Sequence, residues 1–258
     1  MSKQSHIWYQ GIYEKYLCEG RGQRNGKEYK PWIRVQNFSS QGVISRVKGR
    51  KSGRVHHLMS NNELAYFYLL DWSDEVTDIC EQYPLLDLDS AVDIAARAGI
   101  KYPYDNINGF PYVLTTDFMI TTKQDIKART VKMSSELTKE RVLEKLEIER
   151  RYWEKNGIDW KIVTENEISY VKAKNIEWLY SAQDFNAESY ESELSFMIQL
   201  FKNNGCSVME AVRLAEEKFL LETGVGLTLF KYLALNKKII FKISEKLNLN
   251  DMKVSVVK

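Results

Sequence analysis

Cysteine and proline are scarce in this chain of 258 residues, which contains three cysteines and four prolines. Cys18, Cys80 and Cys206 lie far apart and form neither a CxxC pair nor the spacing of a metal site. An odd set without a pairing pattern is typical of a reducing compartment. All four prolines lie in the first half, so the second half is free to be mostly helical.

Long apolar runs are also missing. None approaches the roughly 20 residues that a membrane-spanning helix needs. The N-terminus is polar, and Gln10 and Glu14 interrupt its first apolar residues, so no signal peptide is predicted. We find no internal repeat and no low-complexity linker. These absences together predict a cytoplasmic protein.

The composition is that of a globular protein, with 44% apolar and 28% charged residues. The length allows one large or two small domains. The net charge of +2 hides an uneven distribution. Between Gly20 and Arg54 the only acid is Glu28, whereas every charge from Asp71 to Asp93 is acidic. A nucleic-acid enzyme that uses metal ions fits this pattern, and two oppositely charged solvated faces remain the alternative.

The first part of the chain predicts an α/β core with a mixed sheet. Ser60 opens a helix over about 63–70, and strand-like residues follow at 76–79. Two further strands are predicted within 111–132. A strong helix over 141–155 ends at Asn156-Gly157, and a short strand occupies 160–164.

After about Ser169 the pattern becomes helical. Ser207 and Glu210 form a capping box for one of these helices. We predict helices over 175–180, 191–202 (ending at Asn204-Gly205), 207–221 and 227–235, and strands over 239–243 and 253–257. Two helices joined by a glycine-containing turn and followed by a hairpin suggest a winged helix-turn-helix. We therefore predict two domains, residues 1–168 and residues 169–258, the second being winged-helix-like and either DNA-binding or a protein dock.

The segment Pro111–Lys132 is the most informative part of the sequence. Strand alternation puts Thr115, Asp117 and Met119 on one face, and Ala128, Thr130 and Lys132 on one face of the next strand. If the strands pair as a hairpin, Asp117 and Lys132 project to the same side. An acid and a lysine are costly to bury in a sheet without partners. The pair therefore suits a metal-dependent phosphodiesterase, with a carboxylate on Mg²⁺ and a lysine on water or phosphate.

Glu63 and Thr130 are the next candidates. Ser60-Asn-Asn-Glu63 is a capping box in which Glu63 bonds back to the Ser60 amide, and the alternative is a metal-ligating acid. Thr130 stands two residues before the lysine, where metal-dependent nucleases often have an acid. Its neutral hydroxyl would leave Mg²⁺ to depend more on Glu63, Asp117, the Val131 carbonyl and the substrate phosphate. A plain strand residue is the alternative for Thr130.

Glu149 lies on the predicted helix 141–155. It either supports the site from a second layer or pairs with Lys145 on the exposed helix face, and spacing favours the pair. His56 and His57 are adjacent, so in a strand they point to opposite faces and do not readily share one metal. A structural role is favoured for both, with His56 touching phosphate as the alternative.

The loop from Gly20 to Trp32 is rich in glycine and cations but lacks the GxxxxGK[ST] spacing of a phosphate-binding loop. Cations beside aromatic residues suit contacts to the DNA backbone. The candidate DNA-binding residues are Arg21, Arg24, Lys27, Lys30, Trp32, Arg54 and His56, and a solvated basic loop is the alternative.

Several segments together resemble the TnsA family, the endonuclease subunits of Tn-seven-like heteromeric transposases, including CRISPR-associated ones. The resemblance covers roughly residues 20–180. Its segments are Gly20–Gln23, Gly26–Lys27, Tyr29, Pro31–Trp32, Ser52–Leu58, Glu63–Ala65, Asp78–Ile79, Glu81–Leu86, Gly99–Lys101, Thr116–Phe118, Val131–Lys132, Leu143–Trp153 and Asn175–Tyr180.

The resemblance implies a restriction-endonuclease-like PD-(D/E)xK fold with Glu63, Asp117 and Lys132 at the catalytic positions. It implies bacterial proteins that cut the non-transferred strand of double-stranded DNA at the 5′ ends of the transposon. A DDE transposase subunit, TnsB, would process the 3′ ends, and the C-terminal domain would contact the AAA+ ATPase TnsC. Thr130 departs from the glutamine associated with the family at that position.

The expected cofactor is Mg²⁺, replaceable by Mn²⁺, with two ions held by Glu63, Asp117, Val131 and Thr130. Lys132 would orient water or stabilise developing charge, and Glu149 would lie behind the site. Hydrolysis would leave a 5′-phosphate and a 3′-hydroxyl. Two other functions remain open, a catalytically idle DNA-binding adaptor between transposase and ATPase, and a stand-alone restriction-type nuclease.

Overall fold

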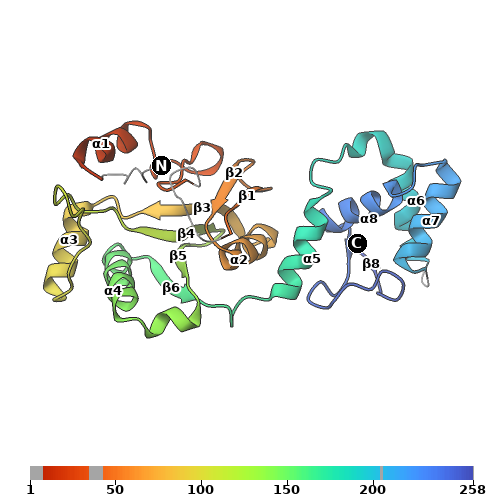
Figure 1. The fold of residues 1–258 in the computed structure, drawn as a ribbon. Helices are drawn as coiled ribbons and strands as arrows, with labels where there is room; N and C mark the ends of the chain where they lie inside the picture. The colour runs from red at the N-terminus through yellow and green to blue at the C-terminus, as the bar shows by residue number, and fades with distance from the viewer. Residues whose placement is uncertain (1–7, 35–42, 204–205, 258) are drawn as a thin grey trace, which may run out of the picture. The chain divides into compact units, whose positions relative to one another are not determined.

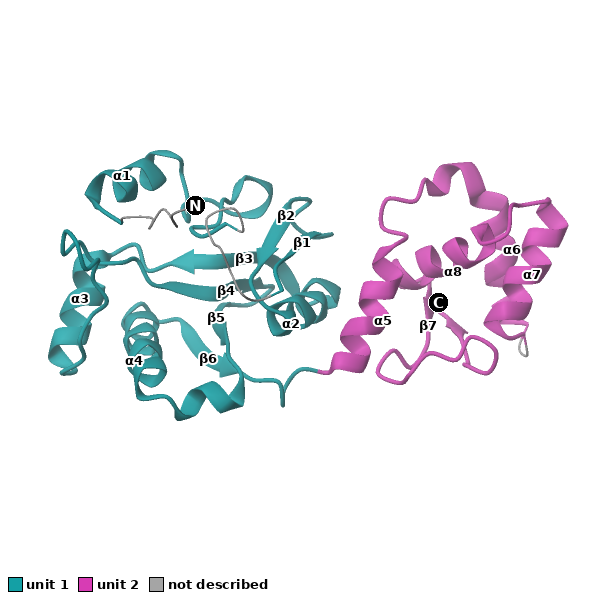
Figure 2. Cartoon of the chain, in the orientation of Figure 1, with its two compact units in different colours: residues 1–168 teal, residues 169–258 magenta. Residues whose placement is uncertain are grey.

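A division after Ile168 separates the chain into two units, residues 1–168 and residues 169–258 (Figure 2). The computed structural model describes residues 8–34, 43–203 and 206–257. Within these described residues, no helix is both long enough and apolar enough to cross a membrane. The two units are described separately below.

The first unit mixes helices and strands (Figure 1). Its elements are α1 (Gln10–Cys18), β1 (Ser45–Lys48), β2 (Val55–Leu58), α2 (Asn61–Trp72), β3 (Val76–Pro84), α3 (Leu88–Arg97), β4 (Thr115–Thr122), β5 (Ile126–Val131), α4 (Glu140–Lys155) and β6 (Asp159–Val163).

A mixed four-stranded sheet in the order β3-β4-β5-β6 forms the centre of this unit. β3, β4 and β5 are antiparallel neighbours, whereas β6 joins β5 in parallel through the crossover helix α4. The predicted mixed α/β architecture is therefore confirmed. Pro84 ends β3, an edge strand, where its missing N–H leaves no ladder bond unmade. β1 and β2 form a separate antiparallel ribbon.

Helices pack against both faces of the sheet. One face carries α3 and α4, which lie side by side (Figure 1). Its core contains Cys80, Met119 and Ala128 from the strands and Ala91, Ala95, Ile148, Tyr152 and Trp153 from the two helices. On the other face, Tyr66 of α2 meets the ring of Phe118 edge-on, with ring centroids 5.7 Å apart. The sheet is thus held between two apolar layers.

Side-chain caps fix where the helices begin. The hydroxyl of Ser60 accepts from the N–H of Glu63 at 3.1 Å and starts α2. The carboxylate of Asp87 accepts from the N–H of Ser90 and starts α3. Gly157, with φ of 69°, follows the end of α4 in a conformation that favours glycine. The first of these caps matters most here, because it fixes the backbone that carries Glu63.

The second unit contains four helices and one short ribbon. They are α5 (Tyr170–Tyr180), α6 (Glu191–Lys202), α7 (Val208–Phe219), α8 (Val225–Leu235), β7 (Ile239–Ile240) and β8 (Ser255–Val256). Ser207 caps α7 by accepting from the N–H of Glu210, as predicted. The strands pair antiparallel but are shorter than expected. The winged-helix assignment stays a prediction, and the predicted helix end at 204–205 lies outside the described residues.

Three features of the first unit differ from the sequence-based expectation. The helices α1 and α3 were not anticipated. β3 continues to Pro84 instead of ending at residue 79, because it is an edge strand and accommodates polar side chains. The strand expected from residue 111 begins only at Thr115, since Pro111 forms just an isolated bridge with Tyr104.

Candidate functional site

Asp117 and Lys132 meet at the end of the β4–β5 hairpin, as the sequence predicted. The ammonium of Lys132 lies 3.1 Å from Oδ2 of Asp117 and 3.1 Å from the Val131 carbonyl oxygen. The N–H of Val131 donates to the same carboxylate oxygen at 2.8 Å. Burial lowers the pKa of Lys132, but the attraction of Asp117 outweighs it and the pKa is raised. Lys132 therefore stays cationic at any working pH.

Strand alternation is interrupted beside Asp117. The predicted sharing of one face by Thr115, Asp117 and Met119 is wrong, because Thr116 and Met119 both contact α4. The hydroxyl of Thr116 accepts from Nε1 of Trp153 at 2.6 Å, and Met119 lies in the α4-side core. Phe118 contacts α2 on the opposite face. This irregularity turns the Asp117 carboxylate toward the N–H of Val131 in β5.

Glu63 occupies the first turn of α2, and its side chain is buried. Oε2 accepts from the N–H of Met59 at 2.9 Å, and Oε1 accepts from the Ser60 hydroxyl at 3.0 Å. The expected bond to the Ser60 amide is thus replaced by one to Met59, a residue earlier. Burial, followed by repulsion from Asp117, raises the pKa of Glu63 to about 7. Glu63 and Asp117 therefore share one electrostatic site.

Gln82 of β3 joins this site, although the sequence analysis did not single it out as a site residue. Its Nε2 donates to Oε2 of Glu63 at 3.3 Å, and its Oε1 accepts from the hydroxyl of Thr115 at 3.4 Å. The φ of Gln82 is 49°, in the left-handed region that L-residues seldom adopt. Such strained positions concentrate at functional sites. Gln82 thus links Glu63 to the strand that carries Asp117.

Glu149 is buried behind the β4–β5 hairpin. Among the described residues it does not form the expected surface ion pair with Lys145. Its Oε1 accepts from Thr116 at 2.6 Å, from Trp160 at 2.9 Å and from the hydroxyl of Thr130. The expected surface pair with Lys145 is therefore wrong, because α4 turns Glu149 inward. Burial, with a smaller contribution from the charge of Asp117, raises its pKa to about 7 against these hydrogen bonds.

The oxygen atoms near Asp117 are of the kind that Mg²⁺ prefers. Both hydrogen bonds described above for Asp117 use its Oδ2 atom, and neither uses Oδ1. The repulsion between buried Glu63 and Asp117 is what a divalent cation would relieve. The described residues contain no group of three or more His, Cys, Asp or Glu side chains arranged for a metal. The fit therefore depends on Glu63, Asp117 and the Val131 carbonyl.

Thr130 as a metal ligand stays a prediction. Its side chain is 1% exposed, and its hydroxyl is engaged by Glu149 and by the indole of Trp160 at 3.3 Å. In this position it supports the Glu149 carboxylate. Residue 130 itself has no carboxylate. A carboxylate does lie directly behind it, that of Glu149 on α4.

Four of the seven predicted DNA-binding residues are packed inside the first unit. Arg21 is 6% exposed, pairs with Glu19 at 2.7 Å and lies over the ring of Tyr16. Trp32 is buried against that same ring. The side chains of Arg54 and His56 both bind Glu81. Their burial withdraws these four side chains from the surface and argues against direct contact with DNA, so their DNA-binding role stays a prediction.

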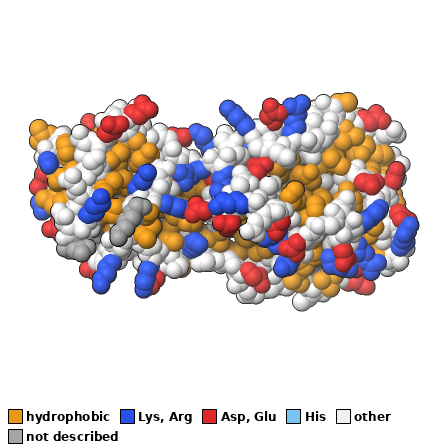
Figure 3. Space-filling model, turned by 180° about the vertical axis from the view of Figure 1, so that it is seen from behind, with side chains coloured by type: hydrophobic (Ala, Val, Ile, Leu, Met, Phe, Trp, Pro, Cys, Tyr) orange, Lys and Arg blue, Asp and Glu red, His pale blue; other side chains and the backbone are white. Residues whose placement is uncertain are grey.

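The other three, Arg24, Lys27 and Lys30, are exposed as predicted. Arg24 pairs with Glu28, and Lys30 donates to the Glu19 carbonyl at 2.8 Å. On the face shown in Figure 3, cationic and anionic side chains are interspersed. A DNA-binding surface would therefore consist of a few neighbouring cations, and not of one broad basic face.

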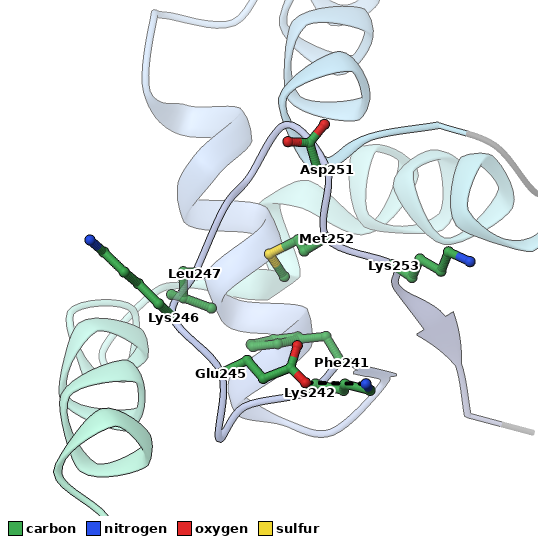
Figure 4. A pocket seen from close by; sticks show the side chains of 8 residues that line it. All are labelled: Phe241, Lys242, Glu245, Lys246, Leu247, Asp251, Met252 and Lys253. Atoms are coloured by element: carbon green, nitrogen blue, oxygen red, sulfur yellow. Dashed lines mark hydrogen bonds and ion pairs between the residues drawn. The ribbon is translucent and has the colours of Figure 1, made fainter.

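A hollow of about 330 Å³ lies in the second unit. Phe241, Leu247 and Met252 line it together with Lys242, Glu245, Lys246, Asp251 and Lys253. Figure 4 shows Lys246 and Lys253 pointing away from Phe241 and Met252, and Lys242 paired with Glu245. Because its charged groups diverge, this hollow has no arrangement for chemistry. The converging carboxylates and lysine are in the first unit.

Comparison with known proteins identifies the family of both units. Residues 73–165 match the family described as TnsA-like endonuclease N terminal, and residues 167–243 match the family described as TnsA endonuclease C terminal. The chain is 40% identical over 240 residues to the Transposon Tn7 transposition protein TnsA of Escherichia coli, covering 91% of this chain and 86% of that protein. Asp117, Lys132 and Glu149 fall inside the first match, and Glu63 precedes it.

Proposed function

Because this chain belongs to the TnsA endonuclease family, we propose that it is the Mg²⁺-dependent DNA endonuclease subunit of a cut-and-paste transposase. It cleaves the non-transferred strand at the 5′ ends of the transposon. The contact of Lys132 with Asp117, beside buried Glu63, carries this proposal. A lysine next to two carboxylates offers oxygen ligands for a metal ion and a cation for the phosphate, which suits metal-assisted hydrolysis of a phosphodiester.

Glu63, Asp117 and the Val131 carbonyl would hold the cation, which would supply an activated water and neutralise charge on the phosphate. Mn²⁺ has similar ligand preferences and would substitute. The ammonium of Lys132 already contacts both Asp117 and the Val131 carbonyl. From this position it would orient the water or the scissile phosphate. Water attacks phosphorus and the bond to the 3′ oxygen breaks, leaving a 5′-phosphate and a 3′-hydroxyl.

The proposed partners are double-stranded DNA, the DDE transposase TnsB and the AAA+ ATPase TnsC. TnsB would cut and join the 3′ ends, so the two activities together would release the element. The second unit, with its own helical core, would dock TnsC. A catalytically idle adaptor is the competing function, and it differs in needing no cation at Asp117.

Strand-resolved cleavage tests the proposal. A transposon-end duplex with different labels on its two strands is incubated with the full chain, both partners and Mg²⁺. Wild type should nick the non-transferred strand, and Asp117→Asn, which keeps the shape of the side chain, should not. Equal nicking by both proteins would support a separate nuclease and an adaptor role for this chain.

A further inference from the structure

The segment Ser52–Leu58 stood out in the sequence, but the site above uses none of it. It forms the end of the β1–β2 turn and all of β2. Its alternate residues face opposite ways, since His56 and Leu58 are fully buried while Val55 is 49% exposed. One half of the segment therefore faces inward, and the other half faces solvent.

The inward half fixes the ribbon to the sheet through Glu81 of β3. Arg54 makes two bonds to this carboxylate, at 2.8 and 2.6 Å. Nδ1 of His56 lies 2.8 Å from it, and the N–H of His57 donates to it at 3.0 Å. Burial would raise the pKa of Glu81, but His56 and Arg54 outweigh it, so the pKa is lowered. Glu81 is thus a buried anion with four donors around it.

The turn between β1 and β2 is fixed as well. Oδ2 of Asp71 in α2 accepts from the N–H of Arg50 at 2.8 Å, and Oδ1 accepts from the N–H of Lys51 at 3.2 Å. The hydroxyl of Ser52 lies 2.7 Å from Nε2 of His56. The turn and β2 are therefore tied to two buried acids, Asp71 and Glu81, which fixes the backbone of the ribbon.

The outward side chains of the ribbon are cationic. The register pairs Arg46 with His57 and Lys48 with Val55. Residues opposite each other in an antiparallel pair share a face. Arg46 and Lys48 are exposed, whereas Ser45 and Val47 between and beside them are half-buried. The ribbon face, defined as Arg46, Lys48, Val55 and His57, therefore carries two exposed cations and no acid.

We propose that the ribbon face binds the sugar-phosphate backbone of duplex DNA. This inference rests on the proposed function, because it names where the nuclease holds its substrate. Charge complementarity favours a polyanion over an apolar partner. A two-stranded ribbon has the dimensions to follow a groove of B-DNA. Rigid anchoring reduces the entropy lost when the cations are held against phosphates.

The test uses the full chain and measures binding of labelled duplexes by fluorescence anisotropy at 50 to 200 mM salt. Each phosphate contact contributes about 0.9 to the slope of log affinity against log salt. The double variant Arg46→Ala/Lys48→Ala should therefore have a slope shallower by about 1.8. The matched control is Lys123→Ala/Lys161→Ala, which removes two exposed cations elsewhere in the first unit and should keep the wild-type slope.

The charge-preserving swap Arg46→Lys/Lys48→Arg should retain the wild-type slope. An unchanged slope in the alanine pair, or an equal change in the control pair, would overturn the inference. So would loss of binding to an acidic partner protein without loss of DNA binding, which would make the ribbon face a protein dock.

Failure of this inference is distinguishable from failure of the proposed function. At saturating protein the alanine pair should cleave at the wild-type single-turnover rate, because Glu63, Asp117 and Lys132 are untouched. If wild type binds and nicks DNA but the slopes agree, only the ribbon inference fails. If wild type does not nick DNA under any condition, the proposed function fails first.

Discussion

Gln82 donates its side-chain amide to Glu63 across 3.3 Å, from a backbone held at φ of 49°. The left-handed conformation costs a residue with a Cβ about 1–2 kcal/mol relative to the right-handed one. The same residue accepts from the hydroxyl of Thr115, two positions before Asp117. The strained residue therefore connects Glu63 to the strand that carries Asp117.

Replacing Gln82 separates the backbone effect from the side-chain effect. Gln82→Ala and Gln82→Gly should both slow cleavage roughly tenfold, since Glu63 loses a donor that positions it. Gln82→Gly should be more stable than Gln82→Ala by about 1 kcal/mol, because glycine adopts the left-handed region without strain. Urea unfolding and single-turnover cleavage check the two parts. Equal stabilities would mean that the backbone relaxes when the side chain is removed.

Lys132→Ala should lower strand cleavage by about 100- to 1000-fold, the cost of removing one preorganised charge from a transition state. The fold should persist, because the N–H of Val131 still binds Asp117 in the variant. Cleavage assays with circular dichroism and melting measure both effects. Lys161→Ala on the edge strand is the control for loss of a cation. Wild-type cutting by Lys132→Ala would remove Lys132 from the reaction.

Asp117→Ala should weaken divalent-cation binding more than Glu63→Ala. Glu63 divides its oxygens among Ser60, Met59 and Gln82, whereas Asp117 leaves Oδ1 outside the two bonds described. Calorimetric titration with Mn²⁺ compares the variants. Glu63→Gln is the cleaner control, because it retains an oxygen for the cap while removing the charge. A reversed order would show that Glu63 is the principal ligand.

Glu149 makes stability depend on pH. Its pKa is raised to about 7 in the folded protein, from an ordinary value near 4.5. Between these values the folded chain holds a proton that the unfolded chain releases, so stability is highest at low pH and falls as pH rises through 7. Glu149→Gln should remove up to about 1.4 kcal/mol per pH unit of this slope. Urea unfolding from pH 5 to 8 measures it, and an unchanged slope would contradict the burial argument.

Removing residues 170–258 should abolish association with the ATPase and leave most salt-dependent DNA binding on residues 1–169. The two units have separate cores, and the ribbon face lies in the first. Pull-down with the ATPase and anisotropy on the fragment measure the two parts. Tight DNA binding by residues 170–258, with no affinity for the ATPase, would show that the second unit is the DNA reader.

The sequence predicted those features that depend only on residues close together in the chain. The helix ending at Asn156-Gly157 and the capping box at Ser207 follow from caps, and the meeting of Asp117 with Lys132 follows from the pairing of two neighbouring strands as a hairpin. The irregularity at Asp117 and the strained backbone of Gln82 do not, because each is imposed by neighbouring strands. Glu149 shows the same limit, since spacing on one helix cannot tell which face the sheet will cover.

The charge pattern of the sequence did not predict which basic residues are exposed. Arg54 and His56 are cationic or polar residues in a basic stretch, and nothing in that stretch reveals their partner. The partner is Glu81, a strand residue in the acidic region, and it draws both inward. The aromatic residues around Arg21 have the same effect. Basic composition therefore marked a region rich in cations without identifying which of them face outward.

Side chains alternate along β2 between the core and the outer face. The inward and outward positions therefore differ in how well they tolerate mutation. His56 and Leu58 face the core, so a change at either disturbs the buried bonds to Glu81 or the apolar layer behind the sheet. The side chains of Val55 and His57, one residue away in each case, lie on the opposite face, and only the backbone N–H of His57 bonds to Glu81. Substitutions on the outer positions can thus accumulate while the catalytic unit keeps its shape. If the ribbon face binds DNA as proposed, a lineage changes its DNA binding one outward residue at a time, without refolding the nuclease.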